Sequence, residues 1–123
     1  MTQVDFAAND VARRLEELTP AQIDELPFGV VRLTTDGVVV QYSKTEGKLS
    51  GFGDRRAVGR DFFRTIAPCM NTSGLLTRLE RDAQRGAVDF EFGQTGDFAD
   101  PSRFIRCRLC SATTGGFWLL LQR

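Results

Sequence analysis

The strongest constraint on the fold is a β-hairpin signal in the first third of the chain. The dipeptide Asp36-Gly37 separates two valine-rich runs, residues 30–33 and residues 38–42. Asp-Gly between such runs is typical of a tight turn joining two antiparallel strands. Strand side chains alternate between faces, so Tyr42 shares a face with the valines two and four positions before it. We therefore expect Tyr42 on the buried face.

Three further strand candidates follow in the second half of the chain, at residues 88–92, 103–112 and 117–122. A glycine-containing turn joins the last two. They are preceded by a segment with helical spacing of apolar residues, 75–85, and Gly86 is suited to the end of that helix. Strands outnumber helices and follow one another in hairpin order, which predicts an α+β fold with an antiparallel sheet.

Two short helices are predicted before the hairpin. Residues 10–18 carry an apolar stripe with Asp10 placed to cap the helix, and Thr19-Pro20 with Gln22 has the features of a second helix start. This second helix ends before Pro27. Helices of this length need packing against other elements to persist, so a detachable N-terminal cap is expected.

Composition indicates one compact domain. The chain has 123 residues, of which 41% are hydrophobic and 26% charged. Sixteen basic and sixteen acidic residues cancel, and no long run of one sign suggests nucleic acid or a membrane surface as a partner. No apolar run approaches the ~20 residues of a membrane span, and the N-terminus lacks a signal-peptide layout, so we expect a cytoplasmic protein.

The chain has three cysteines and no histidine. An odd number of cysteines fits a reducing compartment, and the absence of histidine removes the Cys-His dyad, the Ser-His-Asp triad and the usual metal ligands, so we expect no enzyme. Cys107 and Cys110 lie in a predicted strand, where residues three apart point to opposite faces. We expect one core and one surface cysteine there, and no metal site.

The third cysteine, Cys69, ends the stretch of residues 61–69. Pro68 disfavours a continuing helix, which places the thiol at a chain bend, and Phe62 and Phe63 about two helical turns upstream offer an apolar wall for a flat aromatic ligand. The alternative is a buried structural cysteine, since free cysteines often act as small hydrophobic residues.

A carboxylate follows four residues after Tyr42. Residues 44–60 are rich in glycine, serine and charge, which predicts irregular structure with one or two helical turns, and Glu46 and Ser50 would be one turn apart in the first. Taken alone, Glu46 is most simply a solvated loop residue.

Tyr42, Glu46 and Cys69, with Phe28-Gly29, Gly51 and the Phe-Phe-x-x-x-Ala-Pro-Cys run, resemble the photoactive yellow proteins. The resemblance extends from the N-terminal helices to the final strand with Trp118. It implies a PAS fold: a five-stranded antiparallel sheet with helices on one side and an N-terminal helical cap on the other. Residues 1–123 would form one photoreceptor domain, with residues 1–27 as cap and 28–123 as sensory core.

The resemblance also implies the ligand and its site. Cys69 would carry 4-hydroxycinnamic acid (p-coumaric acid) as a thioester, with the phenolate hydrogen-bonded by Tyr42 and Glu46. The other expected site residues are Ser50, Phe52, Phe62, Ala67 and Pro68. A buried carboxyl without a neighbouring cation favours its neutral form, so we expect Glu46 to be protonated and to donate a hydrogen bond.

The family's blue-light response implies trans to cis isomerisation of the ligand and proton transfer from Glu46. The buried charge left behind would loosen the N-terminal cap. Ser50 replaces the family's common threonine, and Phe52 replaces a common arginine, which predicts a more hydrophobic lid. Residues 93–101 match poorly and lack the methionine linked to rapid return, so dark recovery is expected to be slow.

Two alternatives stay open at this point: a PAS-like module that binds another ligand or none, and a thiol enzyme that uses Cys69. For the photoreceptor, we expect a monomer that signals to a separate downstream protein.

Overall fold

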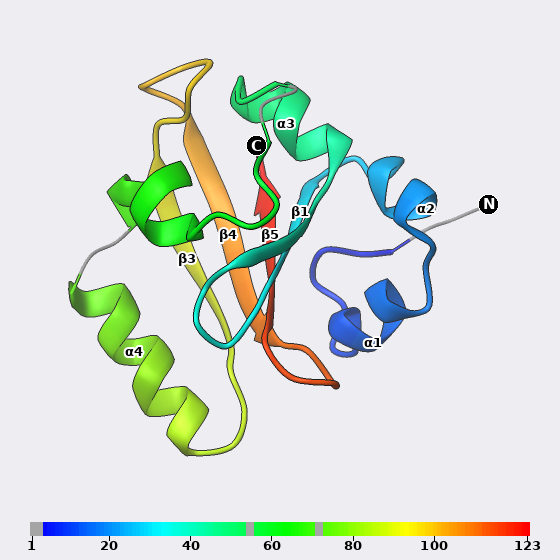
Figure 1. Ribbon diagram of the computed structural model, residues 1–123, viewed down its shortest axis with the longest axis vertical. Helices are drawn as coiled ribbons and strands as arrows, with labels where there is room; N and C mark the ends of the chain where they lie inside the picture. Colours follow the sequence, from blue (N-terminus) through cyan, green and yellow to red (C-terminus); the bar gives the residue numbers. More distant parts are fainter. Residues whose placement is uncertain (1–3, 54–55, 71–72) are drawn as a thin grey trace.

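The computed structural model describes residues 4–53, 56–70 and 73–123, without the side chains of Cys69 and Ser73. Its centre is a sheet of five strands in the order β2-β1-β5-β4-β3, and all neighbouring strands are antiparallel (Figure 1). The strands are β1 (Gly29–Leu33), β2 (Val39–Tyr42), β3 (Asp89–Thr95), β4 (Phe104–Ser111) and β5 (Phe117–Gln122). The predicted α+β fold is confirmed.

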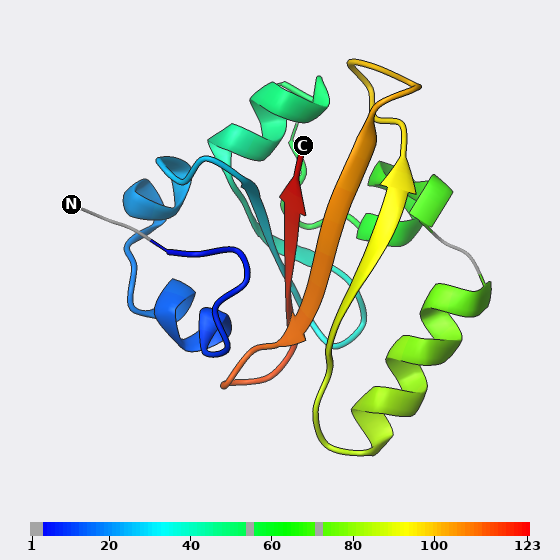
Figure 2. The same cartoon turned by 180° about the vertical axis from the view of Figure 1, so that it is seen from behind.

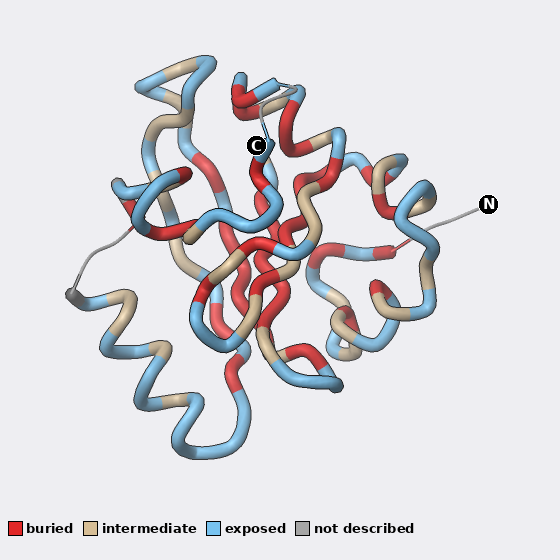
Figure 3. The backbone as a smooth tube through the Cα atoms, viewed as in Figure 1, coloured by how far each residue is buried: buried red, intermediate tan, exposed pale blue. Residues whose placement is uncertain are grey.

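The two faces of the sheet carry separate hydrophobic clusters. In β5, Leu119 and Leu121 belong to one cluster, whereas Trp118 and Leu120 belong to the other. This alternation is what a strand buried on both faces requires. Figure 3 shows the buried segments concentrated along the central strands.

One face is covered by the elements between β2 and β3. These are α3 (Lys44–Ser50), a π-helical turn η1 (Phe62–Ile66), a 3-10 turn η2 (Pro68–Met70) and α4 (Ser73–Gln84). The predicted helix over residues 75–85 corresponds to α4, and Gly86 after it has the left-handed φ of 100° expected at a helix end. Pro68 was expected to prevent a continuing helix, and η1 does end before it. The backbone of Ala67, the residue before the proline, is no longer helical.

The N-terminal helices α1 (Val11–Glu16) and α2 (Pro20–Asp24) lie on the other face (Figure 2). The predicted capping box of α2 is present: Thr19 accepts from the backbone of Gln22, whose side chain accepts from the backbone of Thr19. Asp10 is the N-cap residue of α1, as predicted, but its side chain does not cap the helix. The carboxylate of Asp10 accepts from the Arg13 and Arg14 side chains and makes no cap hydrogen bond.

The hairpin at Asp36-Gly37 is confirmed, but its alternation was predicted incorrectly. Tyr42 pairs with Val31 and Val39 pairs with Leu33, so Val40 is an extra residue in a β-bulge. The bulge turns Val40 out to 50% exposure, while Tyr42 stays on the same side as Val39. Tyr42 therefore faces the core without sharing that face with Val40.

The cysteines in β4 point to opposite faces, as predicted, and neither is on the surface. Cys107 lies in the cluster beneath α4, and Cys110 is buried beneath the N-terminal helices, which corrects the expected surface position. Within the described ranges, no group of His, Cys, Asp or Glu residues is arranged to hold a metal ion. No helix in these ranges has the length and apolar character needed to cross a membrane.

One buried arginine fastens the N-terminal segment to the sheet. Arg108 in β4 donates from Nη1 to the carbonyl oxygens of Phe6 and Ala8, both at 2.8 Å, and from Nε and Nη2 to the carboxylate of Asp89 at 2.9 Å. Nearby, the carboxylate of Glu16 accepts from Trp118 Nε1 at 3.0 Å. Because the guanidinium is buried, its loss would leave these carbonyl groups short of donors.

We predict that Arg108→Gln lowers the free energy of unfolding by about 1 to 3 kcal/mol. Amide hydrogen exchange over residues 4–18 should accelerate, because Phe6 and Ala8 lose their anchor. Chemical denaturation and exchange mass spectrometry measure the two effects. Arg64→Gln, which removes an exposed arginine, is the control and should change the stability by less than about 0.5 kcal/mol. Unchanged protection over residues 4–18 would show that Arg108 does not hold the segment.

Candidate functional site

A cavity of about 350 Å³ lies on the face of the sheet covered by α3, η1 and η2. Its size is in the range of small-molecule sites in proteins. Most of the wall is apolar, and the polar side chains come from β2, α3, the end of β3, the loop after β3 and the residue after β5. The lining residues are Tyr42, Glu46, Ser50, Phe62, Ile66, Ala67, Pro68, Met70, Thr95, Gly96, Asp97, Phe98, Pro101, Ile105, Leu121 and Arg123.

Glu46 reaches the cavity from the first turn of α3. Ser43 caps this helix: its hydroxyl accepts from the backbone N–H of Glu46 at 3.1 Å and from that of Val30 in β1 at 3.0 Å. The side chain of Glu46 then lies against Gly29, where an added Cβ would be 1.9 Å from Oε1. Only glycine at position 29 leaves room for this carboxyl, which is buried rather than solvated.

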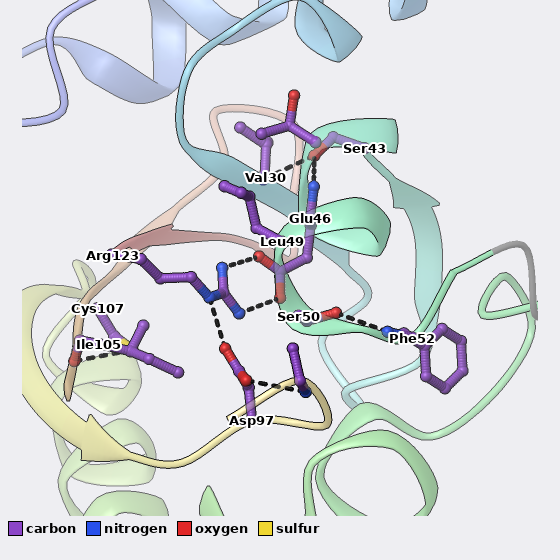
Figure 4. Close-up of polar contacts among 12 residues, drawn as sticks. Val30, Ser43, Glu46, Leu49, Ser50, Phe52, Asp97, Ile105, Cys107 and Arg123 are labelled. Atoms are coloured by element: carbon purple, nitrogen blue, oxygen red, sulfur yellow. Dashed lines mark hydrogen bonds and ion pairs between the residues drawn. The ribbon is translucent and has the colours of Figure 1, made fainter. Parts of the chain in front are cut away.

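Glu46 forms a buried ion pair that the sequence analysis did not anticipate. Arg123, directly after β5, donates from Nη1 and Nη2 to the two carboxylate oxygens at 2.7 and 3.0 Å, and from Nε to Asp97 at 2.8 Å (Figure 4). The side chains of Arg123, Glu46 and Asp97 are only 6%, 4% and 5% exposed. Glu46 was expected to lack a cation, and this premise is wrong.

Burial and ion pairing act in opposite directions on these groups. Burial raises the pKa of Glu46 above its ordinary value, while the hydrogen bonds and charge of Arg123 lower it and the charge of Asp97 raises it. For Asp97, burial raises the pKa, but the hydrogen bonds from Arg123 and the backbone of Asp100 outweigh this, so the pKa is lowered. In this triad, burial therefore prevails for Glu46, whose pKa is raised, and the hydrogen bonds prevail for Asp97, whose pKa is lowered.

Tyr42 and Ser50 complete the polar part of the cavity. The Tyr42 hydroxyl is 3.5 Å from Ser50 Oγ, at the long limit of a hydrogen bond. Burial, followed by the charge of Glu46, raises the pKa of Tyr42, so its phenol remains a hydrogen-bond donor at neutral pH. Ser50 also accepts from the backbone N–H of Phe52 at 3.1 Å.

The remaining expected site residues take two different positions. Phe62, Ala67 and Pro68 line the cavity. Phe52 is buried, with its ring 5.6 Å from that of Tyr42 and 5.4 Å from that of Phe98, so it supports two rings that line the cavity. Position 52 supplies no cation, as expected, but Arg123 brings one to the site from another part of the chain.

The backbone of Cys69 lies in η2, between two residues that line the cavity, Pro68 and Met70. Its side chain lies outside the described part of the structure, so the predicted thiol attachment point stays a prediction. What the structure provides is the position of its neighbours. They belong to the same cavity as Tyr42, Glu46 and Ser50.

We predict that Gly29→Ala destabilises the protein by about 1 to 3 kcal/mol, because the added methyl group would overlap the buried Glu46 carboxyl. Gly74→Ala in α4 is the matched control: its Cβ meets no atom within 4 Å. That change should be neutral or stabilise by up to about 1 kcal/mol. Urea denaturation compares the two, and equal effects would mean that Gly29 is not needed to accommodate Glu46.

Solved structures with the same fold are known. The photoactive yellow protein domain of the sensor histidine kinase Ppr from Rhodospirillum centenum superimposes with a TM-score of 0.81 at 27% identity, covering 92% of this chain and 100% of that domain. A PAS domain of a protein from Colwellia psychrerythraea has a TM-score of 0.56 at 11% identity, covering 83% of this chain and 90% of that one, and supports the fold alone. The predicted PAS-like fold is confirmed.

No family model matches the chain. Curated relatives match over its full length. The photoactive yellow protein of Rhodobacter capsulatus is 33% identical over 128 residues, and that of Rhodothalassium salexigens is 27% identical over 124 residues. In both cases the alignment covers 100% of this chain and 99% of the relative. With this identity and coverage, the chain belongs to the photoactive yellow protein family.

Proposed function

We propose that this protein is a blue-light photoreceptor that carries p-coumaric acid as a thioester on Cys69. The observation that carries the proposal is that Tyr42, Glu46 and Ser50 line the same cavity as both chain neighbours of Cys69. Membership of the photoactive yellow protein family supports the same conclusion.

The residues present fit such a ligand. A flat aromatic acyl group needs an apolar slot, which Phe62, Ile66 and Leu121 help to form, and hydrogen-bond partners for its phenolic oxygen, which Tyr42 and Glu46 offer. When bound, this group supplies absorption of blue light and a trans to cis isomerisation.

The role of this chain's own residues follows from burial. The Tyr42 hydroxyl donates a hydrogen bond, and Glu46, when protonated, is a second donor and the proton source. Once Glu46 gives up its proton while Arg123 is not in contact with it, the uncompensated buried charge destabilises the folded state by several kcal/mol. We propose that residues 1–27 then loosen from the sensory core, residues 28–123, because they form only two short helices packed on the sheet.

The remaining parts of the proposal concern context. The protein would act as a single, monomeric sensory domain with no enzyme activity of its own. It would signal in the cytoplasm to a separate protein.

Mixing the purified, reduced protein with an activated ester of p-coumaric acid should give a coloured adduct that light bleaches. Mass spectrometry should place one acyl group on Cys69. The other two thiols are poor targets, since Cys107 is fully buried and burial raises the pKa of Cys110 to about 12. Cys69→Ala should abolish the adduct, and Cys110→Ala should retain it. An adduct that persists in Cys69→Ala would contradict the proposal, and a tightly bound, non-covalent ligand would instead favour a PAS-like binding module.

Illumination of the adduct should increase amide hydrogen exchange over residues 4–27 more than over the five strands. Exchange mass spectrometry in light and dark measures the difference, with the Cys69→Ala protein as the unresponsive control. Equal protection of residues 4–27 in light and dark would rule out the proposed loosening.

A further inference from the structure

The geometry of the Glu46 carboxyl raises a question about its proton. Both of its oxygens accept hydrogen bonds from the fork of Arg123, at 2.7 and 3.0 Å. A fork-to-fork contact of this kind is the arrangement of a guanidinium with an ionised carboxylate. A carboxyl held this way is an acceptor on both oxygens, so it has no O–H to donate to a ligand.

We propose that Arg123 is a positioning residue that decides when Glu46 can carry a proton, and that Asp97 retains Arg123 when it releases Glu46. The inference deepens the proposed function and rests on it, since it concerns the same cavity. In this arrangement, Arg123 on Glu46 keeps the carboxyl ionised, and withdrawal of Arg123 allows Glu46 to take up a proton and become a donor.

The contacts of Arg123 are divided in a way that suits this role. Nη1 and Nη2 contact Glu46, whereas Nε contacts Asp97 at 2.8 Å, so releasing Glu46 still leaves the guanidinium a buried anionic partner. Asp97 is itself fixed, because its Oδ1 accepts from the backbone N–H groups of Ala99 and Asp100 at 3.0 and 2.8 Å. A buried cation with a second carboxylate can therefore shift without losing all of its charge compensation.

The charges around the cavity make protonation of Glu46 depend on what else is bound there. The charged or titratable groups that face Glu46 are Arg123 after β5, Asp97 from the loop after β3, and Tyr42 from β2. Arg103 lies further away, with Nη1 3.9 Å from Asp97. A second anionic oxygen beside an ionised Glu46 would add like charge in a buried site, which favours uptake of a proton by Glu46.

The proposal predicts how stability depends on pH. The folded-state pKa of Glu46 is raised above its unfolded value, so the stability that this group contributes is fully present below pH 4.5, its ordinary pKa, and is lost as pH rises through the folded pKa. Removing Arg123 leaves burial and Asp97 to raise that pKa further. The deficit in the stability of Arg123→Gln relative to the wild type should therefore be greatest at neutral pH and shrink below pH 4.5. Arg123 also lowers the pKa of Asp97, and the stability gained from this is lost as pH falls. The stability deficit of Arg123→Gln should shrink at low pH for this reason as well.

The direct test is infrared spectroscopy of the protein before any ester is added. The protonated-carboxyl band of Glu46 is identified by its loss in Glu46→Gln, and its intensity is followed from about pH 4 to about pH 9. We expect the band of Arg123→Gln to persist to higher pH than that of the wild type. We expect Arg123→Lys to lie between the two, because lysine keeps the charge but not the fork.

Two further variants separate this role from general packing. Asp97→Asn keeps the side-chain oxygen that caps the loop but removes a negative charge, so the Glu46 band should disappear at lower pH than in the wild type, opposite in sign to Arg123→Gln. This variant also keeps the proposal testable if Arg123→Gln does not fold. Arg64→Gln, which removes an exposed arginine paired with Asp61, should leave the band unchanged.

The outcomes are distinct from those of the acylation experiment. If the midpoint of the Glu46 band is the same in wild type, Arg123→Gln and Asp97→Asn, or moves in one direction in both variants, Arg123 does not control the proton. That result would leave acylation of Cys69 unaffected. Conversely, absence of an adduct on Cys69 would overturn the proposed function while the infrared titration still reports on Arg123 and Glu46.

Discussion

The site depends on keeping a carboxyl group buried beside an arginine. Removing two charges from water costs several kcal/mol each, and only a close, well-satisfied contact offsets this cost. Arg123 meets this condition for Glu46 with two hydrogen bonds and for Asp97 with a third. Two neighbouring residues help to hold the carboxyl in place. Gly29 leaves space for it, and Ser43 caps the helix that carries Glu46. Loss of Arg123 would leave two buried carboxylates without the cation that they share.

The sequence predicted the fold well wherever local chemistry decides the structure. The Asp36-Gly37 turn, the capping box at Thr19 and the strand boundaries near the C-terminus depend on residues close to each other in the chain, and the structure has all of them. Asp10 takes the predicted N-cap position without the capping hydrogen bond, because its carboxylate binds the side chains of Arg13 and Arg14 instead. The predicted alternation of side chains failed at Val40. A regular run of valines does not indicate a bulge, because the bulge arises from the pairing of β2 with β1.

The candidate site was predicted in part, for a related reason. Tyr42, Glu46 and Ser50 are close in sequence, and the resemblance to a family assigned them to one ligand-binding site. Arg123 is 77 residues from Glu46, so no local pattern connects the two. A signal was nevertheless present: strand alternation places residue 123 on the same face as Leu119 and Leu121, which pack toward the cavity side. A charged residue continuing an apolar face requires a buried partner, and Glu46 is that partner.

Strand β5 gives the cavity and the N-terminal cap a common support. Its inward positions on one face end at Arg123, which holds Glu46, and on the other face Trp118 donates to Glu16 of α1. Arg108 in the adjacent strand β4, paired with β5 at Leu120, binds the carbonyl groups of Phe6 and Ala8. The residue that binds Glu46 therefore directly follows the strand on which the N-terminal helices pack. Trp118 and Arg123 lie on opposite faces of the sheet and only five residues apart, so β5 contributes to the packing of the N-terminal helices and to the cavity at the same time.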